Sequence, residues 1–378
     1  MKKASKKGKN TSKSCNDLLV ISDAVVRTVK GVIYSVLELP ARHNYQWKSE
    51  VILDLVVKAK RRGSCIEDAV KSVKRRCPIV HGMKLPKVPT AHTVFDRIRK
   101  VSTKEWIERF EEANDKLLKM AKKRRAFKGF VDLAVDLHGV PFYGNKNTRG
   151  IVGTQKKRGT HWVYQYMTVC VTARKDKYTL AAAPLTQLTS KPEMFKKLLK
   201  KALKYIDGHI GCVYVDREFF NVPYISVLEA LHLQYLMPAK KNAKIKRIIK
   251  ECKTFPAIMP YKMTRHRKTV EFTLVLVKDK KGIVRAFATT LPIEVSQAET
   301  LFDLYGNRWS IETSYSMLGD VRVKTASITY AVRWFLILFG LLLRNGYYLF
   351  NDIVKKVDHV TLITFSEEIM RIAMKKDG

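Results

Sequence analysis

The sequence predicts an α/β protein: a mixed β-sheet flanked by helices, with an all-helical region before it. Three observations lead to this fold class. Residues 16–126 carry apolar side chains at helical spacing. Residues 127–239 give three strands and then alternating helices and strands, and a further group of strands falls within residues 240–291. With 378 residues, 46% of them hydrophobic, the chain can bury a sizeable core in two or three structural units.

The charge balance points to a polyanionic partner. The chain has 72 Lys and Arg against 34 Asp and Glu, a net charge of +38. Such an excess favours binding to nucleic acid. Residues 1–15 are basic and lack an apolar core, so we expect a disordered, phosphate-seeking tail and no secretory signal.

The cysteine spacing and the hydropathy exclude further classes of protein. The 6 cysteines are scattered and contain no C-x-x-C pair, which excludes a zinc ribbon or a disulfide framework. The most apolar run, residues 334–343, is too short for a membrane span of about 20 residues. We therefore expect no membrane association and a cytoplasmic, nucleoid-associated protein.

The first folded region, residues 16–126, is predicted to be a helical DNA-binding domain. The helix beginning at Cys65 and the one that follows Thr90 have two interpretations. In the first, they form a helix-turn-helix that reads DNA bases, although their linker exceeds the usual three or four residues. In the second, they belong to a plain helical bundle whose basic faces contact phosphates without reading bases. The predicted helices cover residues 16–40, 47–61, 65–76, 91–100 and 103–125.

Two strands in residues 127–239 carry acidic side chains. In FVDLAVDLHGV the alternation places Asp132 and Asp136 on one face, and the later strand GCVYVDREF brings Asp216 and Glu218 to one face. This order of elements is that of an RNase H-like fold, in which the first and fourth strands are neighbours. We therefore expect Asp136 and Asp216 to face each other at adjacent strand ends. The other predicted elements are strands 161–173, 178–185 and 234–240 and helices 192–205 and 222–232.

Residues 240–291 are predicted to form a basic, β-rich insertion before the helix expected to begin at Ser296. Runs such as NAKIKRIIKECK and KMTRHRK contain few acids. Two strands, over residues 269–279 and 283–291, flank a Lys281-Gly282 turn and predict a hairpin.

Residues 292–378 are predicted to complete the core and to end in helices over residues 329–350 and 366–374. The stretch SQAETLFDLYGNRWSIETSYSMLG predicts one helix, begun by a capping box of Ser296 and Glu299 and stopped at Gly319. This stretch contains the residues on which a resemblance to a known family depends.

Tyr305, Arg308 and Glu312 follow one another at spacings of three and four, so they share a helix face near Trp309. By themselves they are consistent with an ordinary exposed helix carrying an ion pair worth about 0.2–0.5 kcal/mol. The order Tyr, two residues, Arg, three residues, Glu resembles the signature of a large group of bacterial and archaeal insertion-sequence transposases with a DDE metal site.

The chain departs from that signature at one position. The family pattern adds a Lys that falls here on Gly319, and Arg322 or Lys324 is expected to take its role. The following VKTAS and the apolar helix after it resemble an archaeal branch of the group.

The resemblance implies a catalytic and metal site of Asp136, Asp216 and Glu312, with Asp136 bridging two Mg²⁺ ions and Mn²⁺ as a substitute. Asp132 competes for the first position and Glu218 for the second. We prefer Asp136 because it lies nearer the C-terminal end of its strand, and because the family pattern places the catalytic Asp just before a Gly/Pro-containing turn such as LHGVPFYG.

The resemblance also implies DNA contacts. Tyr305 and Arg308 would grip a phosphate, with Arg322 or Lys324 as a further basic contact, while Trp309 would stack on a base or pack in the core.

The function implied is a DDE transposase that binds the terminal inverted repeats of an insertion sequence. It would cut and join double-stranded DNA by a cut-and-paste route, as a homodimer on paired ends. The alternative is a catalytically inactive or domesticated relative that acts as a DNA-binding protein.

Overall fold

A computed structural model describes residues 11–40, 46–61, 64–76, 88–157, 159–172, 176–306, 323–354 and 361–374. The chain divides into two compact units. Residues 1–120 and 317–378 form the first, which we call the helical unit, and residues 121–316 form the second, the sheet unit. The predicted boundaries grouped the C-terminal helices with the last part of the catalytic core, whereas here they cluster with the N-terminal helices.

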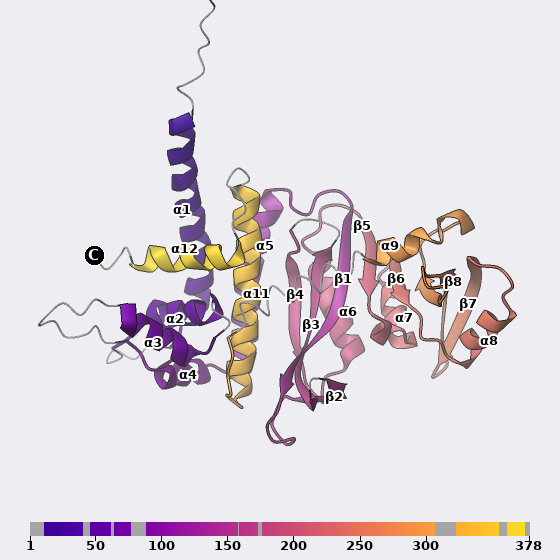
Figure 1. Ribbon diagram of the computed structural model, residues 1–378, viewed down its shortest axis with the longest axis horizontal. Coiled ribbons are helices and arrows are strands. Elements are labelled where there is room, and N and C mark those ends of the chain that lie inside the picture. Colours follow the sequence, from indigo (N-terminus) through magenta and orange to yellow (C-terminus); the bar gives the residue numbers. More distant parts are fainter. Residues whose placement is uncertain are drawn as a thin grey trace, which may run out of the picture. The chain divides into compact units, whose positions relative to one another are not determined.

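The helical unit contains the helices expected from the apolar periodicity (Figure 1). The first of them begins earlier than predicted, at Thr11, inside the stretch expected to be a disordered tail. The C-terminal helices α11 and α12 pack against α1, and they also contact α4 and α2. Helix α11 is apolar around most of its circumference, so burying it requires neighbours on several sides. The described helices are α1 (Thr11–Val36), α2 (Ser49–Arg61), α3 (Ile66–Arg76), α4 (Ala91–Arg99), α5 (Thr103–Lys123), α11 (Tyr330–Ile353) and α12 (Leu362–Met374).

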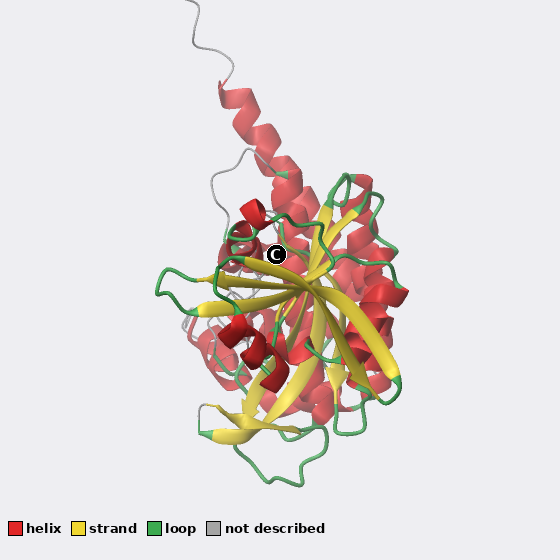
Figure 2. Ribbon diagram, turned by 90° about the vertical axis from the view of Figure 1, so that its right-hand side faces the viewer, coloured by secondary structure: helices red, strands yellow, loops and turns green. Residues whose placement is uncertain are grey.

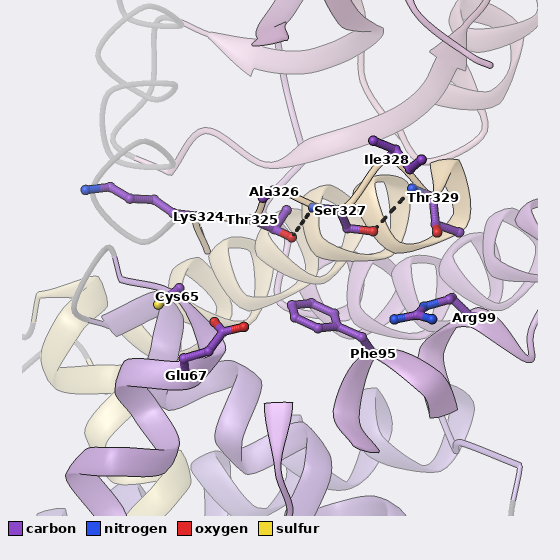
Figure 3. Close-up of a pocket in the computed structure, with 10 residues that line it drawn as sticks. All are labelled: Cys65, Glu67, Phe95, Arg99, Lys324, Thr325, Ala326, Ser327, Ile328 and Thr329. Carbon is purple, nitrogen blue, oxygen red and sulfur yellow. Dashed lines mark hydrogen bonds between the residues drawn. The ribbon is translucent and has the colours of Figure 1, made fainter. Parts of the chain in front are cut away.

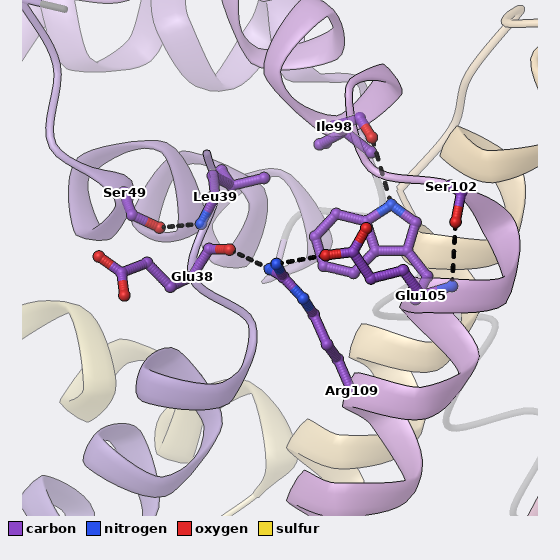
Figure 4. A network of polar contacts seen from close by, with 8 residues as sticks. Glu38, Leu39, Ser49, Ile98, Ser102, Glu105 and Arg109 are labelled. Atoms are coloured by element: carbon purple, nitrogen blue, oxygen red, sulfur yellow. Dashed lines mark hydrogen bonds and ion pairs between the residues drawn. The ribbon is translucent and has the colours of Figure 1, made fainter. Parts of the chain in front are cut away.

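Polar contacts join three of these helices (Figure 4). The Arg109 guanidinium on α5 donates to the carbonyl of Glu38, just after α1, and to Glu105 Oε1 at 2.6 Å. The buried indole N–H of Trp106 donates to the carbonyl of Ile98 in α4 at 3.2 Å. These bonds to backbone carbonyls hold α5 against the ends of α1 and α4.

The sheet unit is built on one twisted, mixed sheet with the strand order β2-β3-β1-β5-β6-β9-β8-β7 and β4 paired to β3 (Figures 1 and 2). Helix α6 (Lys191–Leu203) packs on β3 and β4, and α7 (Val222–Ala230) packs on β7 and β8. The mixed sheet flanked by helices confirms the α/β part of the predicted fold class. The strands are β1 (Val131–Phe142), β2 (Val152–Lys157), β3 (Thr160–Thr172), β4 (Thr179–Leu185), β5 (Ile210–Val215), β6 (Tyr235–Pro238), β7 (Ala257–Arg265), β8 (Lys268–Lys278) and β9 (Val284–Thr289).

The basic insertion extends the same sheet. Strand β9 pairs antiparallel with β6, and β8 and β7 follow outward from β9. The sequence patterns do not predict strands β2 and β7 or helix α8 (Ala243–Glu251). The sequence of β2, VGTQKK, is polar and glycine-containing, and that of β7 contains Pro260, so neither shows a clear strand pattern.

The segment before residue 307 differs in detail from the prediction. A 3-10 turn, η2 (Val295–Gln297), precedes the helix α9 (Thr300–Gly306). The capping box predicted for Ser296 and Glu299 is wrong: Glu294 and Gln297 form it, and Ser296 lies inside the turn. Throughout the part of the chain that the structure describes, no helix has the length and apolar character needed to cross a membrane.

Candidate active site

Strands β1 and β5 run parallel, and their pairing brings two of the predicted acids side by side. Val135 lies opposite Val215 in the register, so Asp136 in β1 and Asp216, which directly follows β5, come next on the two neighbouring segments. Both carboxylates are half-buried. Thr168 lies opposite Asp136 on the other side, on β3, with no exposed surface. The expectation that Asp136 lies at a strand end before a turn is wrong, because HGVPF pairs with β3 and continues β1 to Phe142.

Asp216 is held by the way its strand ends. It is the N-cap of the short 3-10 helix η1 (Arg217–Phe219), and its Oδ1 accepts from the Arg217 backbone N–H at 2.6 Å. Phe219 packs in the core against Phe195 of α6, with ring centroids 5.3 Å apart. The chain therefore leaves the sheet immediately after β5, with the Asp216 carboxyl at the turn.

Asp132, the competitor for the first position, fastens β1 to β5. Between Val131 and Leu133 the register shifts by one residue, because β5 contains an extra residue there. Asp132 Oδ1 accepts from the Cys212 backbone N–H at 2.9 Å, which satisfies a donor in this irregular stretch. A Cβ on Gly211 would come within 2.2 Å of that oxygen, so glycine is needed beside it.

The charge of Asp132 also affects its neighbours on β5. Its Oδ2 accepts from the Tyr214 hydroxyl at 3.4 Å. Burial, together with the nearby Asp132 carboxylate, raises the pKa of the Cys212 thiol well above its usual range. The thiol therefore stays protonated at neutral pH and packs as a small apolar group.

Glu218, the alternative to Asp216, is exposed on η1. Its Oε1 lies 3.4 Å from Lys191 Nζ, at the first residue of α6. This pair links the beginning of α6 to η1.

Tyr305 lies in the interior of the sheet unit, in α9. Its ring is 9% exposed and its centroid is 5.6 Å from that of Phe287 on β9. The hydroxyl donates to the carbonyl of Val215 at 3.4 Å, one residue before Asp216. Tyr305 therefore supports the end of β5 in the described structure.

The remaining predicted site residues are divided between two groups. Lys324 is described, is exposed and belongs to the helical unit. Four others lie outside the described residues: Arg308, Trp309, Glu312 and Arg322.

The described residues supply some, but not all, of the ligands expected for a metal ion. Mg²⁺ prefers carboxylate oxygens and keeps several waters, so two adjacent carboxylates and one more acid suffice. Within the described ranges no cluster of three His, Cys, Asp or Glu side chains is present. Asp136 and Asp216 supply two of the three expected ligands, and the third, Glu312, is outside those ranges.

Two glycines that sequence reasoning missed position this pair of strands. A Cβ on Gly208 would lie 1.9 Å from the carbonyl oxygen of Gly129. Next to this contact, the Val131 backbone N–H donates to the carbonyl of His209 at 2.8 Å. The close approach sets where β1 and β5 begin. No local pattern marks it, because it depends on segments about 80 residues apart.

Comparison with known proteins identifies the class. The family model of the transposase DDE domain matches residues 128–343, more than half of the chain. The chain therefore belongs to this family of transposases, enzymes that cut DNA and transfer its strands and that generally use divalent metal ions.

A solved structure shares the fold. The chain resembles a protein described as "Cryo-EM structure of piggyBac transposase synaptic complex with hairpin DNA (SNHP)" at 14% sequence identity and a TM-score of 0.56, over 95% of this chain and 82% of that one. No curated protein sequence matches the chain.

Proposed function

We propose that this transposase cuts and joins DNA with Asp136, Asp216 and Glu312 as its catalytic carboxylates. The observation that carries the proposal is the parallel register of β1 and β5, which makes Asp136 and Asp216 neighbours. The family match spans all three residues. Asp132 is engaged with the Cys212 backbone, which supports Asp136 as the ligand on β1.

These carboxylates would hold two Mg²⁺ ions, with Mn²⁺ as a substitute. Bound ions about 3.5–4 Å apart would activate the attacking oxygen and stabilise the leaving 3′ oxygen. Asp136, on the central strand, is the residue proposed to contact both ions. The Arg217 N–H that donates to Asp216 Oδ1 helps to fix the orientation of that carboxylate.

The DNA is proposed to be the terminal inverted repeats of the encoding insertion sequence, and the active form a homodimer on paired ends. The net charge of +38 supports extensive phosphate contact. The structural relative is described as a synaptic complex with hairpin DNA, which supports DNA ends as partners. Arg308, Trp309, Arg322 and Lys324 are the proposed contacts, and the Tyr-Arg-Glu pattern and VKTAS suggest the archaeal branch.

Tyr305 has two candidate roles in the proposed site. The match of Tyr305 to the family signature suggests that it contacts a phosphate. Its burial and its hydrogen bond to the Val215 carbonyl suggest instead that it positions Asp216. We favour the positioning role for the described conformation.

The test is cleavage of a labelled duplex that carries the terminal repeat and its flank, with Mg²⁺ or Mn²⁺. We expect nicking at the repeat boundary, lost in Asp136→Asn, Asp216→Asn and Glu312→Gln. Each variant should still bind the duplex in metal-free buffer. If one of these variants cleaves the duplex at the wild-type rate, the substituted residue is not part of the catalytic site.

The second candidate is an inactive relative that acts only as a DNA-binding protein, suggested by Gly319 in place of the family Lys. Tight, specific binding of the repeat without metal-dependent nicking would support it. The adjacent carboxylates on β1 and β5 argue against it, because a protein that only binds DNA has no use for them.

A further inference from the structure

A pocket of about 750 Å³ opens in the helical unit and has no assigned role (Figure 3). It lies between the beginning of α3, the outer side of α4 and the extended segment 324–329. Every lining residue belongs to this one unit. The side chains of interest are those of Glu67, Phe95 and Arg99.

The wall formed by segment 324–329 is fixed by hydrogen bonds. The Lys324 backbone N–H donates to the carbonyl of Ser64 at 2.9 Å, which anchors the segment beside α3. The Thr325 hydroxyl accepts from the Ser327 N–H at 3.0 Å, and the Ser327 hydroxyl accepts from the Thr329 N–H at 3.2 Å. The wall is therefore a preformed chain of short polar turns with hydroxyl groups along it.

The opposite wall carries an aromatic ring and a cation. Phe95 and Arg99 are four residues apart on α4, so they share a face, while Val94 and Ile98 on the other side are buried. Phe95 is half-buried and has no ring contact with another described aromatic side chain. Arg99 is exposed, and no carboxylate among the described residues forms an ion pair with it. Within the described part of the chain, this ring has no aromatic partner and this guanidinium has no acidic one, and both side chains line the pocket.

A carboxylate lies on the other side of the ring. Glu67, in the first turn of α3, and Arg99 are on opposite sides of Phe95 in Figure 3. A ligand for this arrangement is flat in the middle, anionic at one end and a hydrogen-bond donor at the other. A nucleotide with an exocyclic amino group has these three features in this order.

We propose that the pocket binds one unpaired nucleotide of a DNA strand. The base stacks on Phe95, a flanking phosphate pairs with Arg99, and the amino group donates to Glu67. Stacking on an aromatic side chain tolerates any base, whereas a carboxylate acceptor favours cytosine, whose N4 donates, over thymine, which presents O4. This inference rests on the protein's action on DNA but not on its active site.

The experiment measures fluorescence anisotropy of labelled oligo-dC and oligo-dT with the full-length protein in metal-free buffer. We expect oligo-dC to bind more tightly than oligo-dT, and Phe95→Ala to weaken both by about 5- to 150-fold, the range of one lost stacking contact. Phe95→Leu keeps the apolar volume and should also weaken binding, because it lacks the π-face. Glu67→Gln should narrow the difference between the two oligonucleotides.

A matched control distinguishes the pocket from general charge attraction. Arg99→Gln should weaken binding more than Lys104→Gln, which removes an exposed cation of the same unit that already pairs with Glu108 at 3.9 Å. Equal losses for the two variants, or wild-type binding by Phe95→Leu in a normally folded protein, would overturn the proposal.

Two further outcomes separate the possible ligands. Competition by free dCMP as strong as that by the strand would identify a mononucleotide site and reject a DNA-strand site. The proposed strand site would also be rejected if the protein binds duplex DNA tightly and none of the pocket variants changes that binding. Neither result affects the proposed active site, since the assay contains no metal and scores no cleavage.

Discussion

Replacing Asp132 and Asp136 one at a time distinguishes the roles of two carboxylates that share one face of β1. Asp132 accepts from the Cys212 backbone N–H, and Cys212 is only 4% exposed. Asp132→Ala leaves that buried donor without its acceptor, which costs about 1–3 kcal/mol. Asp132→Asn keeps an acceptor oxygen and offers an amide to the Tyr214 hydroxyl, so its effect on stability should be small.

The assays are thermal unfolding and metal-dependent cleavage. In a unit of 150–250 residues, 1 kcal/mol shifts the melting temperature by about 2–4 °C, so Asp132→Ala should lower it by about 2–12 °C. Asp132→Asn should cleave DNA and melt as the wild type does. Asp136→Asn should melt no lower than the wild type in metal-free buffer but should not cleave.

Gly211→Ala provides an internal check of the geometry. Its Cβ would lie 2.2 Å from Asp132 Oδ1, so the carboxylate would have to move away from the Cys212 N–H. This substitution should therefore be destabilising in the wild type and less so when combined with Asp132→Ala. Additive effects would contradict the contact. Loss of cleavage in a normally folded Asp132→Asn, or wild-type cleavage by Asp136→Asn, would refute the assignment of the two acids.

Three further predictions follow from other contacts. Tyr305→Phe, which removes a bond to the Val215 carbonyl, should slow cleavage without weakening DNA binding; a loss of affinity would favour the phosphate-contact role. Gly208→Ala should lower both stability and cleavage, because its Cβ would lie 1.9 Å from a rigid backbone oxygen, and normal melting would contradict this. Asp54→Ala leaves the buried Lys30 ammonium, 3.2 Å from Asp54 in the wild type, without its partner and should cost about 3–5 kcal/mol in urea unfolding. Burial raises the pKa of Asp54, so wild-type stability should fall as pH rises from the ordinary carboxyl pKa through the raised one, and Asp54→Asn should remove that slope.

Much of the sheet unit was predictable because its signals are local or topological. Alternation in β1 placed Asp132 and Asp136 on one face, and the order of strands and helices made β1 and β5 neighbours. Neither signal chooses between the two acids. The assignment of the proposed metal ligand depends on the extra residue in β5 and on which carboxylate accepts from the Cys212 N–H. Both features arise only when β1 and β5 pair.

Other features could not be predicted for a different physical reason. Helical spacing placed Tyr305 with Arg308 and Glu312, yet periodicity does not say whether a face points to solvent or to a core. Tyr305 turns toward Phe287 because an amphipathic aromatic side chain can be buried when its hydroxyl finds an acceptor. The sequence predicts that the apolar run of α11 is helical and too short to span a membrane, but it does not identify the helices that cover it, because α1 and α4 are distant in sequence.

The contacts around β5 have a common consequence for catalysis. This strand has only six residues, and Asp216, a proposed catalytic residue, directly follows it. In that role its carboxylate would have to stay within about 0.5 Å of a productive position. Asp132 holds the irregular beginning of β5, and the Tyr305 hydroxyl holds its last carbonyl. Both supports come from other segments of the sheet unit and neither needs to touch the substrate. A change that removes one of these supports but spares folding, such as Tyr305→Phe, should therefore lower the cleavage rate and leave DNA affinity unchanged. Asp132→Asn keeps its acceptor oxygen and should not have this effect. The pocket variants, in contrast, should lower affinity first.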